Sequence, residues 1–335
     1  MTRAPLKRLG VTTSGLRQAK RIHRILELAG WRVRPLSRFT PFRRVDAVAG
    51  WGGKPTAIEA RRVAAARGAP FVTLEDGFIR SEGLGVAGDP PLSLILDQRG
   101  VYTDFRSRDS LEAMLLEGVS ATPELVQRAE AALAALRRGR VSKYNHAPDA
   151  RPGLLPDRFV LAIDQTVGDA AIAGAAATEA SFERMLRAAL AEAAGATVLV
   201  KTHPDVLAGV RQGYLDPPAV EALGGRVLGE DVNPWDLFER AERVYAVSSQ
   251  MGYEAVLAGC EAHVFAWPFY AGWGVTVDRA PPPSTAPPRA ARSALELFAA
   301  SHLLYPLYYD PQRDALATCE SIVERLSRPR AVGRV

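Results

Sequence analysis

The sequence SKYNHAPDARPGLLPDRFVLAIDQTVGD (residues 142–169) divides this chain into two parts. Its first half, Ser142–Pro156, holds three prolines and several polar residues, which is the composition of an exposed linker. Its second half contains the unbroken apolar run Phe159–Ile163, which is typical of a strand buried on both faces of a sheet. We therefore expect one domain to end near residue 150 and another to begin with this strand.

Strand-like and helix-like segments alternate on both sides of this division. Before it, we expect strands at Leu9–Thr12, Trp31–Pro35, Ala47–Trp51 and Pro70–Leu74, a hairpin of Leu92–Leu96 with Gly100–Tyr102, and helices at Leu16–Ala29, Ala57–Arg67, Ser110–Leu116 and Pro123–Arg138. After it, we expect strands at Phe159–Ile163, Thr197–Thr202, Arg243–Val247 and His263–Ala266, and helices at Ser181–Ala194, Trp235–Ala241, Gly252–Ala258, Ala291–Ala300 and Arg313–Leu326.

Two βα arrays in succession predict an α/β protein with two Rossmann-like domains facing a central cleft. Residues 1–150 are expected to form the first domain and residues 151–290 the second. The helices in residues 291–335 are expected to pack back on the first domain.

The composition is that of a globular protein of 335 residues, with 47% hydrophobic and 24% charged residues. No apolar run approaches the roughly 18 residues of a membrane span, and the first ten residues lack the apolar core of a signal peptide. Two cysteines, Cys260 and Cys319, are too few for a disulfide framework and lack metal-ligand spacing. These features predict a cytoplasmic protein with free thiols.

Arginine gives the chain a formal charge of +5, with clusters in residues 3–8, 17–24, 32–44 and 137–140. We do not expect nucleic acid as a partner, because no helix-turn-helix, zinc-finger or RNP string occurs and aromatic residues do not alternate with the basic ones. An anionic sugar, a phosphate-bearing donor or an anionic membrane surface accounts for the basic N-terminal half equally well. A genome rich in G and C, which favours Arg and Ala, also accounts for much of it.

Polar residues follow the ends of several predicted strands, and they include Glu75, Asp76, Asp164, His203, Ser248 and Ser249. In open α/β sheets, ligands bind beyond the carboxyl ends of the strands, so we expect these side chains to line one crevice. Each also has a simpler interpretation. An acidic pair before Gly is often a loop, His-Pro is often a turn, and Ser-Ser before a helix is often an N-cap.

Ser248-Ser249-Gln250 opens a predicted helix, and a helix start exposes unpaired N–H groups and the positive end of the dipole. Anions bind at such a position, two hydroxyls add donors, and Gly252 would allow a phosphate to approach closely. Lys201 and His203, near the end of the neighbouring strand, would supply positive charge to the same phosphate. No Asp-x-Asp string occurs, so we expect a donor with a single phosphate, no metal site and no cofactor.

Asp164 and Asp169 lie in the loop after Phe159–Ile163, where both can point into the expected cleft. A carboxylate near an anomeric carbon could be a nucleophile or could stabilise an oxocarbenium-like centre. The alternative is helix capping by one of them, Asp164 in particular.

Seven segments, in order between Trp51 and Asp310, resemble those of the bacterial capsule-biosynthesis β-Kdo transferases, above all the N-terminal module of the two-module enzymes of that family. The segments are LEDGFIRS (74–81), PPLSLILD (90–97), SKYN (142–145), IDQTVGD (163–169), VKTHPDV (200–206), SSQMGYEAVLAG (248–259) and PFYAGWGVT (268–276). PFYAGWG and EDGF together are specific to the family. The acidic-acidic-Gly, His-Pro and Ser-Ser strings are also similar to those of bacterial sialyltransferases, which use a CMP-activated keto-sugar acid as well.

The resemblance implies a GT-B-like fold, with an acceptor-side first domain and a second domain that binds the CMP-sugar donor. It also implies transfer of 3-deoxy-D-manno-oct-2-ulosonic acid (Kdo) from CMP-β-Kdo to a Kdo-terminated glycolipid, with retention through a covalent adduct on an Asp. By the same resemblance, the chain would act at the inner face of the inner membrane, as a peripheral protein among other proteins of the capsule machinery.

Carried over residue by residue, the resemblance makes Asp169 the nucleophile in preference to Asp164, and Glu75 the acid/base or stabiliser. The CMP phosphate would be held by Lys201, His203, Ser248, Ser249 and Gln250. Glu254 would reach the ribose hydroxyls, Arg80 would pair with the Kdo carboxylate, and Tyr270 and Trp273 would shape the donor pocket or pack in the core.

The enzymes of this family usually carry a second transferase module, and 335 residues have room for only one. The chain is then either a natural single-module relative or part of a longer enzyme, and we expect one linkage, β-2,4 by analogy with the N-terminal module. An inverting, sialyltransferase-like reaction with Glu75 or Asp76 as general base is an alternative. A non-catalytic scaffold of the capsule machinery is another.

Overall fold

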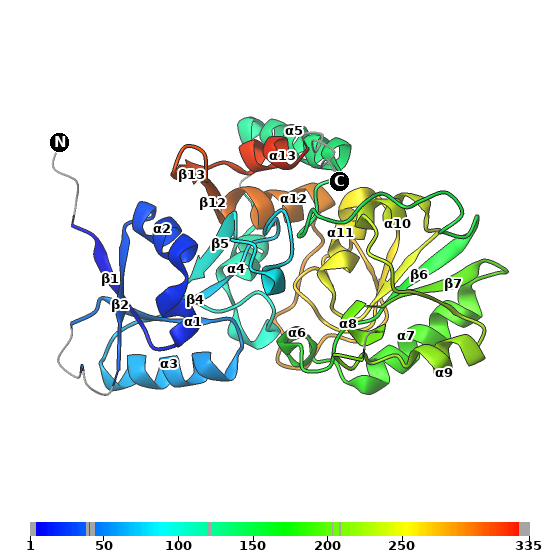
Figure 1. The fold of residues 1–335 in the computed structure, drawn as a ribbon, viewed down its shortest axis with the longest axis horizontal. Coiled ribbons are helices and arrows are strands. Elements are labelled where there is room, and N and C mark those ends of the chain that lie inside the picture. The colour runs from blue at the N-terminus through cyan, green and yellow to red at the C-terminus, as the bar shows by residue number, and fades with distance from the viewer. Residues whose placement is uncertain are drawn as a thin grey trace. The chain divides into compact units, whose positions relative to one another are not determined.

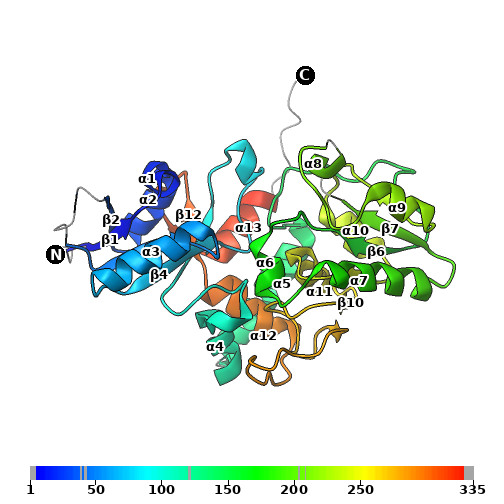
Figure 2. The same cartoon turned by 90° about the horizontal axis from the view of Figure 1, so that it is seen from below.

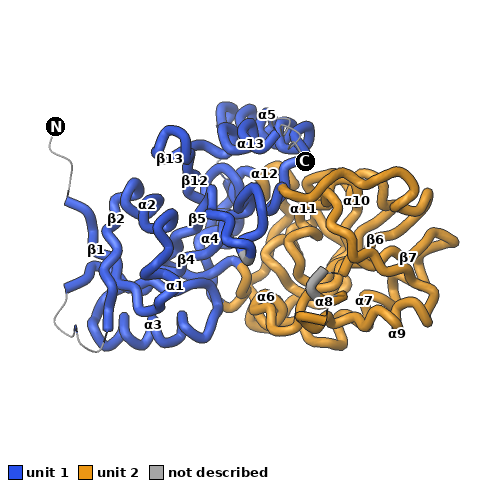
Figure 3. The backbone as a smooth tube through the Cα atoms, in the orientation of Figure 1, with its two compact units in different colours: residues 1–102, 107–145, 299–335 blue, residues 103–106, 146–298 orange. Residues whose placement is uncertain are grey.

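The computed structural model describes residues 5–37, 40, 44–119, 122–202, 204–207 and 209–327. They fall into two compact units, one within residues 1–102, 107–145 and 299–335 and one within residues 103–106 and 146–298 (Figure 3). The change of unit after residue 145 lies inside the expected linker, and residues 291–298 belong to the second unit. Within the described ranges, no helix combines the length and apolar character needed to cross a bilayer.

The first unit contains a mixed sheet with the strand order β13-β12-β5-β4-β3-β1-β2 (Figure 1). Its parallel part consists of β1 (Lys7–Val11), β2 (Trp31–Pro35), β3 (Ala47–Trp51) and β4 (Phe71–Asp76). Its antiparallel part consists of β5 (Ser93–Asp97), β12 (Leu307–Asp310) and β13 (Ala315–Ala317). The helices and short turns outside the second unit are α1 (Ser14–Gln18), α2 (Lys20–Leu28), α3 (Pro55–Ala66), η1 (Gly85–Ala87), α4 (Ser110–Glu117), α5 (Pro123–Gly139), η3 (Ala299–Leu304) and α13 (Cys319–Ser327).

Helices cover both faces of the parallel part. On α2, Ile22, Ile25 and Leu26 recur at helical spacing and pack over Leu9 and other residues of β1, β3 and β4. On the other face, α3 contributes Ala60 and Ala64, which pack with Val48 of β3 (Figure 1). The predicted alternation of apolar strands and amphipathic helices is therefore present in this part of the chain.

The predicted hairpin of Leu92–Leu96 with Gly100–Tyr102 is wrong. β5 instead pairs with β4, with Leu96 opposite Leu74, and on its other side with β12. Oδ1 of Asp97 accepts hydrogen bonds from the backbone N–H of Arg99 (2.7 Å) and Gly100 (3.3 Å), and its Oδ2 accepts one from Ser110 N (2.8 Å). These bonds turn the chain away from the sheet towards α4.

The second unit contains a parallel sheet with the strand order β11-β10-β9-β6-β7-β8. Its strands are β6 (Phe159–Ile163), β7 (Thr197–Lys201), β8 (Arg226–Leu228), β9 (Val244–Ala246), β10 (Ala262–Val264) and β11 (Val277–Asp278). Its helices are α6 (Ala170–Gly174), α7 (Glu179–Glu192), α8 (Pro204–Leu207), α9 (Pro217–Ala222), α10 (Pro234–Arg240), α11 (Gln250–Ala258) and α12 (Ala294–Phe298), and η2 (Phe105–Ser107) lies largely in this unit.

Every residue of β6 is buried, because helices cover both of its faces. Val160 and Ala162 point to the side of α7 and α9, whereas Leu161 and Ile163 point to the side of α10 and α11. Figure 2 shows α7 lying across the strands on one side. This two-sided burial explains why the sequence of β6 is an unbroken apolar run instead of an alternating one.

The strand order places the first strand of the second unit, β6, between β7 and β9. From β6 the chain moves outward through β7 to β8, and it then returns to the other side of β6 to form β9, β10 and β11. This is the order of a Rossmann fold, and the reversal between β6 and β9 is its topological switch point, where such sheets bind ligands.

Candidate functional site

A glutamine links the two strand ends at the switch point of the second unit. Gln165 follows β6 after one residue, and its Oε1 accepts hydrogen bonds from the backbone N–H (3.1 Å) and the hydroxyl (3.3 Å) of Ser248, which follows β9. The Nε2 of Gln165 lies 3.5 Å from Oδ2 of Asp169. The structure thus brings the predicted residues Asp169 and Ser248 together through Gln165. The sequence interpretation missed this residue, although its place directly after Asp164 at a strand end could have identified it.

The start of α11 has the form of a capped helix N-terminus. Ser249 is the N-cap, and its hydroxyl accepts a hydrogen bond from the backbone N–H of Met251 at 3.2 Å. Gln250 donates through Nε2 to Oε1 of Glu254 at 3.2 Å, and Glu254 is buried. The first turn therefore presents backbone N–H groups beside two serine hydroxyls, next to the switch point.

Gly252 has a different role from the one expected. A Cβ atom added there would lie 2.5 Å from the hydroxyl of Tyr270 and 2.9 Å from Cβ of Ala246. The small residue therefore makes room for a tyrosine and for β9, and the expectation that it makes room for a phosphate is corrected. Tyr270 and Trp273 are both fully buried. Their burial agrees with the alternative that they pack in the core.

Lys201 is the last residue of β7, the neighbour of β6. Its Nζ donates to the backbone carbonyl of Thr202 at 3.1 Å. Burial lowers the pKa of this ammonium, and the nearby carboxylates of Asp231 and Glu230 oppose that effect. His203 lies outside the described residues.

Of the two aspartates after β6, the helix cap is Asp169 and not Asp164, the residue for which capping was the expected alternative. Asp164 is buried, and its Oδ1 accepts hydrogen bonds from the backbone N–H groups of Tyr214 and Leu215, both at 3.2 Å. Burial raises its pKa to about 6, and these backbone donors, with that of Gln165, oppose the rise. Asp164 therefore holds a loop, and it is not the helix cap.

Asp169 caps α6, and its Oδ1 accepts a hydrogen bond from Ala171 N at 3.0 Å. The preceding Gly168 has a φ of +87°, which turns the chain so that Asp169 begins the helix. The side chain is exposed, unlike that of Asp164. Of the two carboxylates, Asp169 is the one that a substrate can reach.

In the first unit, Glu75 and Asp76 are the last two residues of β4. Oε1 of Glu75 accepts a hydrogen bond from the backbone N–H of Asp76 at 2.9 Å. Burial, and then the charge of Asp76, raise the pKa of Glu75 to about 7, against the opposing effects of that backbone N–H and of Lys143 and Lys54. A carboxyl group with this pKa can both release and accept a proton near neutral pH.

Arg80 forms an ion pair inside the first unit. Its Nε lies 2.9 Å from Oδ2 of Asp76, and both side chains are largely buried, with exposed fractions of 12% and 16%. Its Nη1 donates to the hydroxyl of Ser81 (2.8 Å) and to the carbonyl of Asp89 (3.0 Å). The guanidinium is thus committed to internal partners in this structure, where the sequence had suggested a sugar carboxylate.

A second cation, Lys143, belongs to the same group of charges. Its carbonyl accepts hydrogen bonds from the backbone N–H of Arg80 (3.0 Å) and Ser81 (3.3 Å), so the segment 142–145 runs beside residues 80–82. Burial alone would lower the pKa of Lys143, but its neighbours Tyr102, Tyr144, Asp76 and Glu75 raise it above its ordinary value. The SKYN string was the signal for this residue, which the sequence interpretation did not select.

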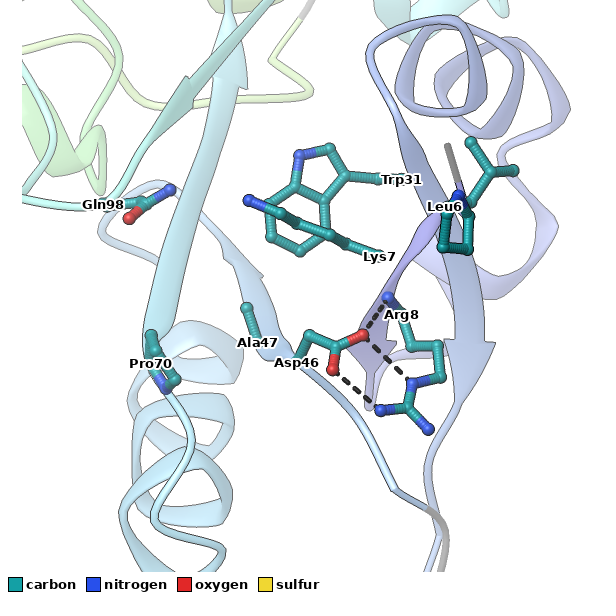
Figure 4. A pocket seen from close by; sticks show the side chains of 9 residues that line it. Leu6, Lys7, Arg8, Trp31, Asp46, Ala47, Pro70 and Gln98 are labelled. Atoms are coloured by element: carbon teal, nitrogen blue, oxygen red, sulfur yellow. Dashed lines mark hydrogen bonds and ion pairs between the residues drawn. The ribbon is translucent and has the colours of Figure 1, made fainter. Parts of the chain in front are cut away.

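A pocket in the first unit lies at the amino ends of the parallel strands β1 to β4, away from the carboxyl end of β4. In it, Asp46 accepts hydrogen bonds from Arg8, and Nζ of Lys7 lies 5.4 Å from the ring centre of Trp31 (Figure 4). None of the predicted site residues lines this pocket. Among the described residues of the chain, no three His, Cys, Asp or Glu side chains form a group that could hold a metal ion.

Comparison with known sequences identifies relatives in capsule biosynthesis. Residues 46–151 and 155–308 match the family described as "Capsule polysaccharide biosynthesis protein". The capsule polysaccharide modification protein LipA of Neisseria meningitidis serogroup B is 42% identical over 293 residues, which are 85% of this chain and 42% of LipA. The lipopolysaccharide-processing protein LpsZ of Rhizobium meliloti is 36% identical over 244 residues, 71% of this chain and 54% of LpsZ. The chain thus spans about half, or less, of the length of these curated relatives.

Two solved structures are similar over nearly their whole length. One is the KpsC β-Kdo 2,4 transferase of Thermosulfurimonas dismutans, with a TM-score of 0.85 and 38% identity, covering 98% of this chain and 99% of that chain. The β-Kdo 2,7 transferase of the same KpsC has a TM-score of 0.72 and 24% identity, covering 96% and 98%, and this similarity concerns the fold alone. The predicted α/β fold of GT-B-like type, with two Rossmann-like units, is confirmed.

Proposed function

Since the chain belongs to the family of capsule polysaccharide biosynthesis proteins, we propose that it is a glycosyltransferase that moves Kdo from CMP-β-Kdo to a Kdo-terminated glycolipid. The similarity to the KpsC β-Kdo 2,4 transferase along the whole chain supports this substrate class and a β-2,4 linkage. The single observation that carries the proposal is the chain of contacts from Asp169 through Gln165 to Ser248 at the switch point. It joins a reachable carboxylate to a helix N-terminus suited to a phosphate.

The phosphate of CMP is proposed to bind at the start of α11. This end of the helix dipole is positive, and the hydroxyl of Ser249, which accepts from Met251 N and keeps its own proton, is a proposed donor. The hydroxyl of Ser248, which donates to Gln165 in this structure, would turn to the phosphate, and Gln250 lies beside them. Lys201 and His203 add positive charge as the phosphate leaves with the electrons of the glycosidic bond. Glu254 is buried and bonded to Gln250, so it acts on this end through Gln250 instead of reaching the ribose hydroxyls.

Asp169 is proposed as the nucleophile of a retaining reaction. Its carboxylate forms a bond to the anomeric carbon of Kdo while the bond from that carbon to the CMP phosphate breaks, and CMP departs. The acceptor hydroxyl then attacks the same carbon, the bond to Asp169 breaks, and the hydroxyl proton passes to a base. Two inversions at one carbon give net retention.

Glu75 is proposed as the base that takes this proton, because its pKa of about 7 suits both proton uptake and release near neutrality. Arg80 is proposed to position Asp76 and the end of β4 instead of binding Kdo directly. No metal or cofactor is assigned to the reaction. The proposed place of action is the inner face of the inner membrane, where a glycolipid acceptor and other capsule proteins would be met.

Intact-protein mass spectrometry with CMP-Kdo tests the proposal. In wild-type protein or in Glu75→Gln, where transfer to the acceptor is slowed, we expect a protein species heavier by one Kdo residue, with the mass on the peptide containing Asp169. Asp169→Ala should show no such species. Turnover without an adduct, together with an inverted product anomer by NMR, would establish the inverting reaction instead. A protein that releases no CMP with any Kdo-terminated acceptor would be a scaffold.

A further inference from the structure

The segment Pro268–Gly274 (PFYAGWG) lies against the start of α11. The hydroxyl of Tyr270 donates a hydrogen bond of 2.7 Å to the backbone carbonyl of Ser249, the N-cap of that helix. Tyr270 is fully buried, and Gly252 in the first turn leaves the space that the hydroxyl occupies. The carbonyl of Ser249 is thus held by a side chain that water cannot replace.

Arg289 holds this segment in shape. Its Nη1 donates to the backbone carbonyls of Pro268 (2.8 Å) and Ala271 (2.7 Å), on either side of Tyr270. Its guanidinium lies 4.9 Å from the ring centre of Trp267 and 5.1 Å from that of Trp273. A flat group with several donors can stack on aromatic rings while bonding two carbonyls, which an ammonium does poorly.

Trp273 closes the segment on itself by donating from Nε1 to the carbonyl of Phe269 at 2.8 Å. A continuous series of contacts therefore connects Arg289 to the segment that contains Tyr270, and Tyr270 to Ser249. The orientation of the Ser249 peptide sets the direction of the N–H groups that follow it in the first turn of α11.

We propose that Tyr270 and Arg289 are positioning residues for the phosphate-binding end of α11, holding its first turn in the orientation that receives the phosphate of the donor. This proposal rests on the proposed function and deepens it. Neither side chain touches the donor. Both act through the peptide group that joins Ser249 to Gln250, and the segment PFYAGWG connects them to it.

Tyr270→Phe tests the proposal, because it removes one oxygen and leaves the ring in place. With CMP as the probe in isothermal titration calorimetry, we expect the Kd to rise about three- to tenfold, the value of one buried hydrogen bond. The matched control is Tyr245→Phe in the same unit. Tyr245 is also fully buried and donates from its hydroxyl to Glu192 at 2.9 Å, away from α11. Its loss should reduce stability by a similar amount and leave the Kd for CMP within twofold.

Hydrogen exchange without ligand gives a readout that does not depend on CMP. Tyr270→Phe should speed exchange in the peptide covering residues 248–254, and Tyr245→Phe should not. Arg289→Lys should weaken CMP binding in the same direction, whereas Arg226→Lys, which loses a single bond to the Leu154 carbonyl (2.7 Å), should not.

Three results separate the possibilities. If wild-type protein binds no CMP, the proposed function fails, and this role of α11 fails with it. If wild-type protein binds CMP and Tyr270→Phe and Arg289→Lys bind it equally well, only the positioning role is overturned. Equal weakening by Tyr270→Phe and by Tyr245→Phe would also overturn it, because the effect would then follow from stability alone.

Discussion

The carboxylates at the strand ends of the two units have different kinds of partner. At the end of β4, the acidic side chains lie among cations, with Asp76 paired to Arg80 and with Lys143 close to both Glu75 and Asp76. At the end of β6, backbone N–H groups take the place of cations, so that Asp164 is bound by Tyr214 N and Leu215 N. The stability of the region at the end of β4 therefore depends on its charged side chains, and that of the region at the end of β6 depends on the path of the backbone.

This difference matches the different work proposed for the two regions. A phosphate brings its own negative charge, and the dipole of a helix start can receive it together with the positive charge proposed for Lys201 and His203. A carboxyl group that exchanges protons needs its charge balanced from within the protein, because each ionisation changes the local charge by one. Substitutions that separate charge effects from backbone effects should therefore distinguish the two units.

Asp169→Ala should have the largest effect, about 10³-fold or more on turnover, because the proposed nucleophile is lost. The matched control is Asp216→Ala. Asp216 is an exposed N-cap of α9 in the same unit, and it accepts a hydrogen bond from Ala219 N at 3.2 Å. Both variants should lose about 1 kcal/mol of stability from the missing cap. Steady-state rates and thermal melts measure the two effects, and equal rates for both variants would show that Asp169 is only a cap.

Arg80→Ala should have the largest effect on stability. It leaves the mostly buried Asp76 without its ion-pair partner, and Oδ1 of Asp76 already has no hydrogen-bond donor among the described residues. Removing one member of a buried pair costs about 3–5 kcal/mol. Arg158→Ala breaks the more exposed pair with Glu242 in the other unit, with exposed fractions of 62% and 30%, and should cost about 0–1 kcal/mol. Urea unfolding of both variants measures the difference, and similar losses would contradict the contrast between the units.

The fold could be predicted largely from local patterns, and the exceptions depend on distant partners. Apolar runs ending in polar residues located β4, β6, β7 and β9, because buried parallel strands require such runs. The partners of β5 could not be predicted, because an apolar strand pairs as well with a strand before it as with one after it. The strand β13 lies within a segment predicted as a helix, and it exists because β12 pairs with it.

The candidate site could be predicted as a set of positions but not as a set of contacts. Strand ends identified Glu75, Asp164 and Ser248, since the carboxyl edge of a parallel sheet is a property of the fold, whereas the preference for Asp169 came from the family resemblance. Which aspartate caps a helix depended on the turn at Gly168, and which acid Arg80 pairs with depended on how residues 76–80 turn after β4. Sequence patterns do not contain these geometries.

Glu75→Gln should change how stability depends on pH. The pKa of Glu75 in the folded protein, about 7, lies above its ordinary value of 4.5, so ionisation disfavours the folded state. Wild-type protein should therefore lose stability as pH rises from about 4.5 to about 7. The variant should show no such loss. Its stability relative to that of wild-type protein should be highest at pH 8 and lowest at pH 4.

Asp164→Asn provides the comparison from the second unit. The pKa of Asp164 is about 6, above its ordinary value of 3.8. The gain in stability of Asp164→Asn relative to wild-type protein should therefore be complete by about pH 6. Thermal melts between pH 4 and pH 8 measure both curves. If the two variants gave the same curve of stability against pH, the different surroundings described for Glu75 and Asp164 would be contradicted.

Ser249→Ala should have the smallest effect, and it separates a cap from a binding group. The variant loses the bond to Met251 N, and a missing N-cap costs about 1 kcal/mol of stability. Thr122→Ala in the first unit removes an equivalent cap of α5, where Thr122 accepts a hydrogen bond from Leu125 N at 3.3 Å. The two stability losses should be alike, but only Ser249→Ala should weaken CMP binding, because α11 begins at the switch point and α5 does not. If calorimetry gives the same Kd for CMP in both variants, the hydroxyl of Ser249 serves the helix and not the phosphate.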